Sequence, residues 1–322
     1  VPDIPGLSNA GFLTSETVFD VVKPPASLVI LGGGYKACEF GHFFAGMGTK
    51  VSIIGRNRVI LPREEPEVSD LVADKMSEYL RVETNKEVTQ VRKDSGGKMV
   101  VCRDRESGEV SEIAGDELLV VTGVKSNADL LDVAATGVRT DASNYIVVNE
   151  YLETSAPGIW AFGDIIGRHM FRHTANYASD VAWFNAYGKV KVRFDEHAVP
   201  HAVFTYPEVG AVGMTEAEAR AKGRRYFIGF ALYSSCAKGF AMGDEDSFVK
   251  VIVDPETLRI LGATICGPQA SILVQPLVYL MNCADQTFTP IARSQVIHPA
   301  LSEAVVNAFA NLMDSEHHHE HA

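Results

Sequence analysis

The fold of this chain is decided by the stretch Leu28-Val29-Ile30-Leu31-Gly32-Gly33-Gly34-Tyr35-Lys36-Ala37-Cys38-Glu39. Four apolar residues lead into a glycine cluster, and the cluster leads into a helical pattern. A strand, a tight turn and a helix in this order can hold the pyrophosphate of a dinucleotide on the amides of the helix N-terminus. Gly32 permits the turn, Gly34 lets the backbone approach phosphate, and Ala37 lets the helix pack closely on a sheet.

The flanking residues complete a unit of strand, helix and strand. The predicted strands are residues 27–31 and 51–54, and the predicted helix runs from residue 35 to 47 before Gly48. A glycine motif in this context is far more specific than the glycines alone. The alternative is a glycine-rich loop in an ordinary α/β protein.

Composition places the chain among acidic globular proteins. Its 322 residues allow two or three domains, and 46% of them are hydrophobic. The formal net charge of −12 argues against a nucleic-acid partner, which would require a basic surface. No apolar run is long enough to cross a bilayer, and no signal-peptide pattern is visible. We therefore expect a cytoplasmic protein with no membrane partner.

The five cysteines do not form a redox or metal motif. The two closest in sequence, Cys266 and Cys283, are seventeen positions apart, so no C-x-x-C pair exists. Cys38 follows the glycine cluster and is expected to be a small buried hydrophobe. We assign no metal site and no catalytic cysteine.

Later segments show two changes of pattern. A helix is predicted from Pro66, and another over residues 174–187. Predicted strands lie at 88–91, 99–102, 118–121, 145–148 and 157–164, and residues 104–108 are predicted to form a turn between two strands. From about residue 197 strands are bunched together, with helices near 271–283 and 299–313, which indicates an α+β domain. Residues 215–218, Thr-Glu-Ala-Glu, are predicted to form a capping box at a helix start.

The turn after the second strand reads Gly55-Arg56-Asn57-Arg58. NAD-binding folds carry an acid at this point, on the ribose hydroxyls, whereas arginine accommodates the 2′-phosphate of NADP. Arg56 or Arg58 could bind that phosphate bidentately, so the turn favours NADP(H). The alternative is that both arginines are solvated loop charges.

Two further polar residues are placed for chemistry. Asp164 ends a predicted strand and could accept hydrogen bonds from a ribityl or ribose hydroxyl, or could cap a helix. His298 precedes Pro299 and a predicted helix, and Glu303 five positions later could hydrogen-bond one ring nitrogen. That bond would set the tautomer and raise the basicity of the other nitrogen. The alternative is an ordinary surface or core histidine.

Taken in order, these segments resemble the class I pyridine nucleotide–disulfide oxidoreductases, the flavoprotein family of dihydrolipoamide dehydrogenase, glutathione reductase, mycothione reductase and mercuric reductase. The resemblance covers residues 1–315. It is carried by residues 32–39, 121–123, 154–164, 170–173, 204–209, 238–239 and 298–303. It implies an α/β fold with a Rossmann-like NAD(P)-binding domain, a partial FAD-binding domain and a C-terminal α+β dimerisation domain.

The resemblance also implies domain boundaries. These are a connecting segment of the FAD domain at 1–22, the NAD(P)-binding domain at 23–143, the remainder of the FAD domain at 144–195, the dimerisation domain at 196–314, and a disordered tail at 315–322.

Site residues follow from the same resemblance. Glu39 would lie near the flavin, Asp164 would bind its ribityl chain, and His298, held by Glu303, would be the general acid/base for thiol–disulfide exchange. Because that histidine acts on the partner subunit's active site, a homodimer is implied. The expected FAD- and NAD(P)-binding residues are Gly32, Gly33, Gly34, Tyr35, Lys36, Ala37, Glu39, Arg56, Arg58, Val88, Gly123, Asp164, Met170, Phe171, Arg172 and His173.

Two departures from the family pattern affect these expectations. The N-terminal part that carries the first FAD motif and the redox cysteine pair has no counterpart, so we expect a fragment that is inactive alone. Lys125 stands where the family usually has arginine, which keeps the charge but loses the planar fork. The implied activity is a dihydrolipoamide dehydrogenase-like transfer of electrons between NAD(P)H and a dithiol/disulfide. The alternatives are an NADPH enzyme similar to mycothione or mercuric reductase, and a non-catalytic nucleotide-binding dimerisation module.

Overall fold

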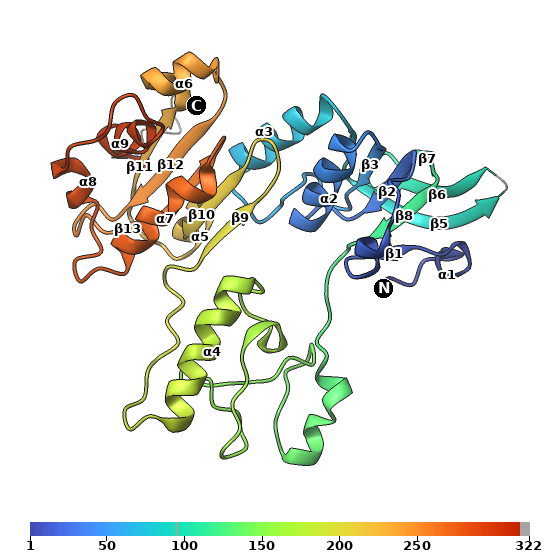
Figure 1. The fold of residues 1–322 in the computed structure, drawn as a ribbon, viewed down its shortest axis with the longest axis horizontal. Coiled ribbons are helices and arrows are strands. Elements are labelled where there is room, and N and C mark those ends of the chain that lie inside the picture. The colour runs from blue at the N-terminus through green and yellow to red at the C-terminus, as the bar shows by residue number, and fades with distance from the viewer. Residues whose placement is uncertain (95, 316–322) are drawn as a thin grey trace. The chain divides into compact units, whose positions relative to one another are not determined.

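The computed structural model describes residues 1–94 and 96–315, which form two compact units (Figure 1). Unit 1 joins residues 1–123 to the chain from Ala202 onward, and unit 2 is Val124–His201. The predicted disordered tail lies outside the described residues, except for Ser315.

A parallel sheet carries the glycine cluster in unit 1. Its spatial order is β1 (Leu13–Thr14), β8 (Glu117–Val120), β2 (Ser27–Leu31), β3 (Lys50–Ile54) and β4 (Arg81–Glu83). Helix α2 (Tyr35–Gly46) connects β2 to β3, and α3 (Pro66–Ser77) connects β3 to β4. The predicted strand–turn–helix–strand unit is therefore confirmed.

Alternating residues of β2 reach two different apolar clusters. Leu28 and Ile30 pack in the cluster that contains α2 and α3, whereas Val29 and Leu31 pack in the cluster on the other face. That second cluster includes the antiparallel sheet of β5 (Lys86–Asp94), β6 (Gly97–Asp104) and β7 (Val110–Gly115), and helix α1 (Leu7–Ala10). Burial on both faces explains why β2 is apolar at four successive positions.

The C-terminal part of unit 1 is the predicted α+β arrangement. Its sheet has the order β14 (Met313–Asp314), β11 (Phe227–Leu232), β12 (Phe248–Val253), β13 (Ile260–Cys266), β10 (Val209–Gly213) and β9 (Pro200–Val203). The helices are α5 (Glu216–Ala221), α6 (Ala237–Met242), α7 (Ala270–Met281), α8 (Thr289–Arg293) and α9 (Ser302–Ala310). The predicted capping box at Thr215 is present. The predicted helix over 299–313 was too long, since α9 begins at Ser302 and residues 313–314 pair with β11.

Unit 2 contains α4 (Arg172–Tyr187) and short 3₁₀ segments, among them η4 (Gly163–Ile166). The strands predicted at 145–148 and 157–164 were wrong. Ile146 and Trp160 form only isolated bridges, with Thr140 and Glu153. An apolar run becomes a strand only where a neighbouring strand takes its backbone hydrogen bonds, and within the described residues these runs have no such neighbour. Asp164 consequently lies in η4 and not at the end of a strand.

Candidate functional site

The turn between β2 and α2 has the backbone geometry that requires glycine at its first position. Gly32 has a φ of +144°, and its amide donates to the Ile54 carbonyl at 3.0 Å. A Cβ on Gly32 would lie 2.8 Å from the Val121 carbonyl oxygen. The turn is thus clamped between β3 and the end of β8.

Gly34 instead faces open space. A Cβ there would meet nothing within 4 Å, and its φ of −93° is accessible to any residue. Gly34 is also the N-cap of α2, with no side-chain cap, so this end of the helix is open to an anion. Tyr35 and Lys36 form the first turn of α2, and Ala37 is fully buried against the sheet. The predicted turn thus fits a dinucleotide pyrophosphate.

Gly33 is held by the loop that follows β3. The Leu61 amide donates to the Gly33 carbonyl at 2.7 Å, and a Cβ on Gly33 would lie 3.3 Å from the Gly55 Cα. The same loop carries Arg56 and Arg58, both exposed. The glycine turn and the two arginines therefore belong to one continuous piece of structure.

The hairpin between β6 and β7 lies beside this arginine loop. Arg105 donates from Nη1 to the Arg56 carbonyl at 3.1 Å, and Arg58 lies 3.4 Å from Glu106. The backbone amides of Ser107 and Glu106 donate hydrogen bonds to the Asp104 carboxylate, and these bonds hold the hairpin turn in place. The same bonds keep the pKa of Asp104 far below its usual range. A surface hollow here is lined by residues that include Arg56, Arg103 and Arg105.

Sequence reasoning missed Arg103 and Arg105. The turn at residues 104–108 was predicted, but its position beside Arg56 depends on the packing of the antiparallel sheet against the parallel one. A sequence pattern of local turns carries no signal for that contact.

Three other predicted residues occupy distinct environments in unit 1. Glu39 on α2 is half-buried, and its Oε1 accepts a hydrogen bond from the Phe204 amide at 2.9 Å. Burial raises the pKa of Glu39, and this hydrogen bond only partly opposes the rise. Gly123 has a φ of +148° with open space at its Cβ position. Val88 on β5 packs against the apolar cluster of the antiparallel sheet.

The residues expected at the flavin lie in unit 2. Asp164 is exposed, and Gly163 before it packs so closely on α4 that a Cβ would lie 3.4 Å from the Ala175 Cβ. The N-cap of α4, Phe171, makes no side-chain cap bond. An exposed carboxylate beside an open helix N-terminus can take the hydroxyls and one anionic end of a ligand. These residues fit part of a flavin site.

The stretch Met170–His173 is ordered by its aromatic rings. Phe171 stacks on His173 and on His201, with ring centroids 5.5 and 5.6 Å apart. His173 Nε2 lies 2.7 Å from the Pro200 carbonyl oxygen, and because a carbonyl only accepts, that nitrogen carries a proton. Arg172 is exposed and bonds Asn176 within α4.

His298 and Glu303 meet at the N-terminus of α9, as predicted. His298 Nδ1 lies 2.8 Å from Glu303 Oε1, and the Ala300 amide donates to Glu303 Oε2 at 2.9 Å. The hydrogen bond from His298 and the bond from Ala300 both lower the pKa of Glu303. The imidazole side chain is 67% exposed, so Nε2 is open to a reacting partner.

The thiols and other potential ligands give no second chemical site. All five cysteines are free, and Cys38 is fully buried as expected, which raises its pKa to about 12 and leaves it unreactive. Across residues 1–94 and 96–315, no group of His, Cys, Asp and Glu could hold a metal ion. Over the same residues, no helix has the length and apolarity to cross a bilayer.

Two family models of known proteins match the chain, one in each half. The family model described as pyridine nucleotide-disulphide oxidoreductase matches residues 1–179, and the dimerisation domain of the same family matches residues 199–309. The chain belongs to the pyridine nucleotide-disulphide oxidoreductase family. Members of this family use FAD and a pyridine nucleotide.

Curated relatives and solved structures agree with this assignment. The chain is 35% identical to mycothione reductase of Mycobacterium tuberculosis, over 95% of this chain and 66% of that protein. It is 32% identical to dihydrolipoyl dehydrogenase of Haloferax volcanii, over 98% of this chain and 65% of that protein. The HOCl-induced flavoprotein disulfide reductase RclA of Escherichia coli has a similar fold, with a TM-score of 0.86 and 27% identity over 96% of this chain and 70% of that one. The chain therefore spans about 66% of the length of its first curated relatives.

Proposed function

We propose that this chain is the nucleotide-binding and acid–base part of a flavin-dependent oxidoreductase that passes electrons between NAD(P)H and a dithiol/disulfide, similar to dihydrolipoyl dehydrogenase. The His298–Glu303 pair carries the proposal. An exposed imidazole whose Nδ1 is occupied by a carboxylate presents Nε2 to accept or donate a proton. Thiol–disulfide exchange needs such a group, because each thiol must lose or gain a proton.

The proposed roles of the other residues follow from their positions. The open N-terminus of α2 at Gly34 binds the nucleotide pyrophosphate, and Asp164 binds the ribityl hydroxyls of FAD. Met170–His173 line the flavin. Bound FAD would supply the hydride and electron chemistry between the nucleotide and the dithiol/disulfide. His298 holds or releases the proton at Nε2.

We also propose that NADP(H) is preferred to NAD(H). No acid follows β3, and the exposed arginines Arg56 and Arg58 are joined by Arg105 at the same surface. These cations suit the 2′-phosphate of NADP. A site specific for that phosphate favours the alternative of an NADPH-dependent reductase similar to mycothione or mercuric reductase. The 35% identity to mycothione reductase supports that alternative.

The proposal includes the assembly and the behaviour of the isolated chain. A homodimer through the domain at 196–314 would bring His298 to the partner's active site. The other proposed domain segments are a connecting segment at 1–22, the NAD(P)-binding domain at 23–143 and the remainder of the FAD domain at 144–195. The 322-residue chain alone, whose cysteines form no vicinal pair, is expected to bind nucleotide without reducing disulfides. A cytoplasmic location stays a prediction.

Two measurements test this function. The first titrates the chain with NADPH and NADH by calorimetry. The second follows nucleotide-dependent reduction of lipoamide and of the disulfides of glutathione and mycothiol, for the flavin-loaded protein that contains this chain and for its His298→Gln variant. Binding of NADPH, with a reductase activity that the variant loses, supports the proposal. If nucleotide binds but the flavin-loaded protein reduces none of these disulfides, the non-catalytic dimerisation module is the better description.

A further inference from the structure

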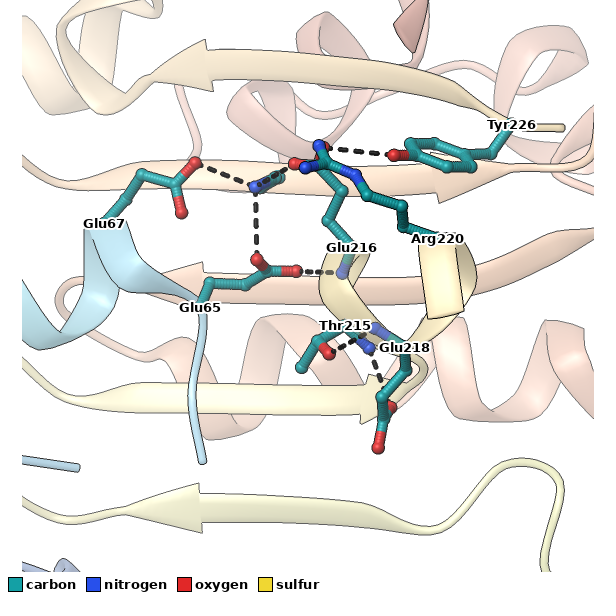
Figure 2. A network of polar contacts seen from close by, with 8 residues as sticks. Glu65, Glu67, Thr215, Glu216, Glu218, Arg220 and Tyr226 are labelled. Atoms are coloured by element: carbon teal, nitrogen blue, oxygen red, sulfur yellow. Dashed lines mark hydrogen bonds and ion pairs between the residues drawn. The ribbon is translucent and has the colours of Figure 1, made fainter. Parts of the chain in front are cut away.

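A buried lysine on the six-stranded sheet of unit 1 contacts carboxylates at the starts of helices α3 and α5. Lys250 lies on β12, and its side chain is only 2% exposed. Its Nζ lies within hydrogen-bond distance of three carboxylates, at 3.2 Å from Glu65, 2.8 Å from Glu67 and 2.9 Å from Glu216. We call these four residues the Lys250 cluster. Figure 2 shows Glu67 approaching from α3, Glu65 from the coil that leads into α3, and Glu216 from α5.

The three carboxylates around Nζ determine the protonation state of Lys250. Burial alone would lower the pKa of Lys250, but the charge of Glu65 and the hydrogen bonds that Lys250 donates to Glu67 and Glu216 outweigh burial and raise it. Lys250 therefore stays protonated and donates all three of its hydrogens. A buried cation with three carboxylate acceptors fixes the positions of all three side chains.

Glu65 is the member of the cluster that ends the 55–65 loop. It is the N-cap of α3, yet its carboxylate makes no cap bond to its own helix. Oε2 instead contacts Lys250, and Oε1 accepts from the Glu216 amide at 2.7 Å. Glu65 is only 2% exposed, and both of its carboxylate oxygens contact residues of the C-terminal domain. These two contacts attach the N-terminus of α3 to the C-terminal domain.

The loop before Glu65 connects this anchor to the glycine turn. The Glu64 amide donates to the Leu61 carbonyl at 3.0 Å, and Ser69 Oγ on α3 donates to the same carbonyl at 3.1 Å. The Leu61 amide donates in turn to Gly33 at 2.7 Å. These hydrogen bonds, together with the short run of backbone between Leu61 and Glu65, therefore connect the Lys250 cluster to the turn, and the same 55–65 loop carries Arg56 and Arg58.

We propose that Lys250, acting through Glu65, is a positioning residue for nucleotide binding: it holds the 55–65 loop so that Leu61 supports Gly33 and the loop arginines face the nucleotide. The inference rests on the nucleotide-binding function proposed above. A purely structural role would make the cluster stabilise unit 1 without affecting the nucleotide.

The test compares Lys250→Met with a matched buried lysine. Lys98 on β6 is 9% exposed on its side chain and is paired with Glu117, but it has no bond to the 55–65 loop. Lys98→Met should lower the melting temperature and leave the Kd for NADPH unchanged. Lys250→Met should weaken NADPH binding about tenfold, as expected for a change along a contiguous network. Glu65→Gln, which preserves shape, should weaken NADPH binding by a smaller factor.

Hydrogen exchange supplies a readout that does not depend on the nucleotide. The Leu61 amide should exchange faster in Lys250→Met and in Glu65→Gln, and at the wild-type rate in Lys98→Met. The inference is overturned if Lys250→Met folds and both its Kd for NADPH and the exchange rate of its Leu61 amide are unchanged. If Lys250→Met does not fold, Glu65→Gln decides by the same criteria. If the wild-type chain binds neither nucleotide, the proposed function fails, while the exchange rates still decide whether the cluster positions the loop.

Discussion

Glu303 holds the imidazole of His298 through one oxygen and the Ala300 amide through the other, at 2.8 and 2.9 Å. One oxygen therefore anchors the Glu303 carboxylate to the backbone while the other orients the His298 ring. Since the carboxylate can only accept from Nδ1, the proton of a neutral His298 lies on Nδ1 and the lone pair lies on Nε2.

Glu303→Ala should remove this tautomer preference. Two-dimensional ¹⁵N spectra of the imidazole should show Nδ1 protonated in the wild type and a mixture of tautomers in the variant. Because the folded-state pKa of Glu303 is lowered, its interaction is present above the ordinary carboxyl value of 4.5 and is lost only as the pH falls below it. In the flavin-loaded protein, His298→Gln should slow disulfide exchange by about 10²- to 10⁴-fold, the usual contribution of a general acid/base. Identical ring spectra for wild type and Glu303→Ala would contradict this interpretation.

Gly32 and Gly34 should respond oppositely to alanine. Gly32→Ala places a Cβ against the Val121 carbonyl in a backbone region with positive φ, so we expect a loss of stability of about 1–3 kcal/mol. Gly34→Ala meets open space and should melt near the wild-type temperature, but the added methyl group occupies the place of a phosphate. Differential scanning calorimetry and NADPH titration separate the two effects. Unweakened NADPH binding by Gly34→Ala would show that the pyrophosphate lies elsewhere.

The arginine loop should set the choice of nucleotide. In Arg56→Gln/Arg58→Gln we expect the NADPH affinity to fall by about 1.5–3 kcal/mol, the usual contribution of hydrogen bonds to a charged group, with the NADH affinity nearly unchanged. Arg92→Gln is a suitable control, because Arg92 is an exposed arginine that pairs with Glu112 on the antiparallel sheet. Equal losses for both nucleotides, or a wild-type preference for NADH, would show that Arg56 and Arg58 are solvated loop charges.

Glu39 should make stability depend on pH. Its folded-state pKa is raised by burial, so the carboxyl is neutral and harmless at low pH and becomes destabilising as the pH rises through the unfolded and then the folded value. Glu39→Gln keeps an oxygen acceptor for the Phe204 amide and cannot ionise. The variant should therefore gain melting temperature at pH 7 relative to the wild type, with little difference at pH 3. A larger gain at pH 3 would reverse the sign and refute the burial argument.

The sequence allowed prediction wherever local geometry imposes the residue type. Gly32 is required by its positive φ, the capping box at Thr215 by unpaired helix amides, and the approach of Glu303 to His298 by five residues of chain. The predicted strands at 145–148 and 157–164 were wrong because an apolar run does not reveal whether a partner strand exists. The Lys250 cluster and Arg105 could not be predicted, since their partners come from segments far apart in the sequence.

The pairing of β1 with β8 gives the first residues of the chain a protective role. Thr14 and Leu13 cover the outer edge of β8, whose Leu118 and Leu119 are fully buried. A truncated version that starts after residue 22 would expose a short apolar edge strand with open backbone hydrogen bonds, which is a template for aggregation. Shorter expression products intended for crystallisation or binding assays should therefore retain residues 1–22.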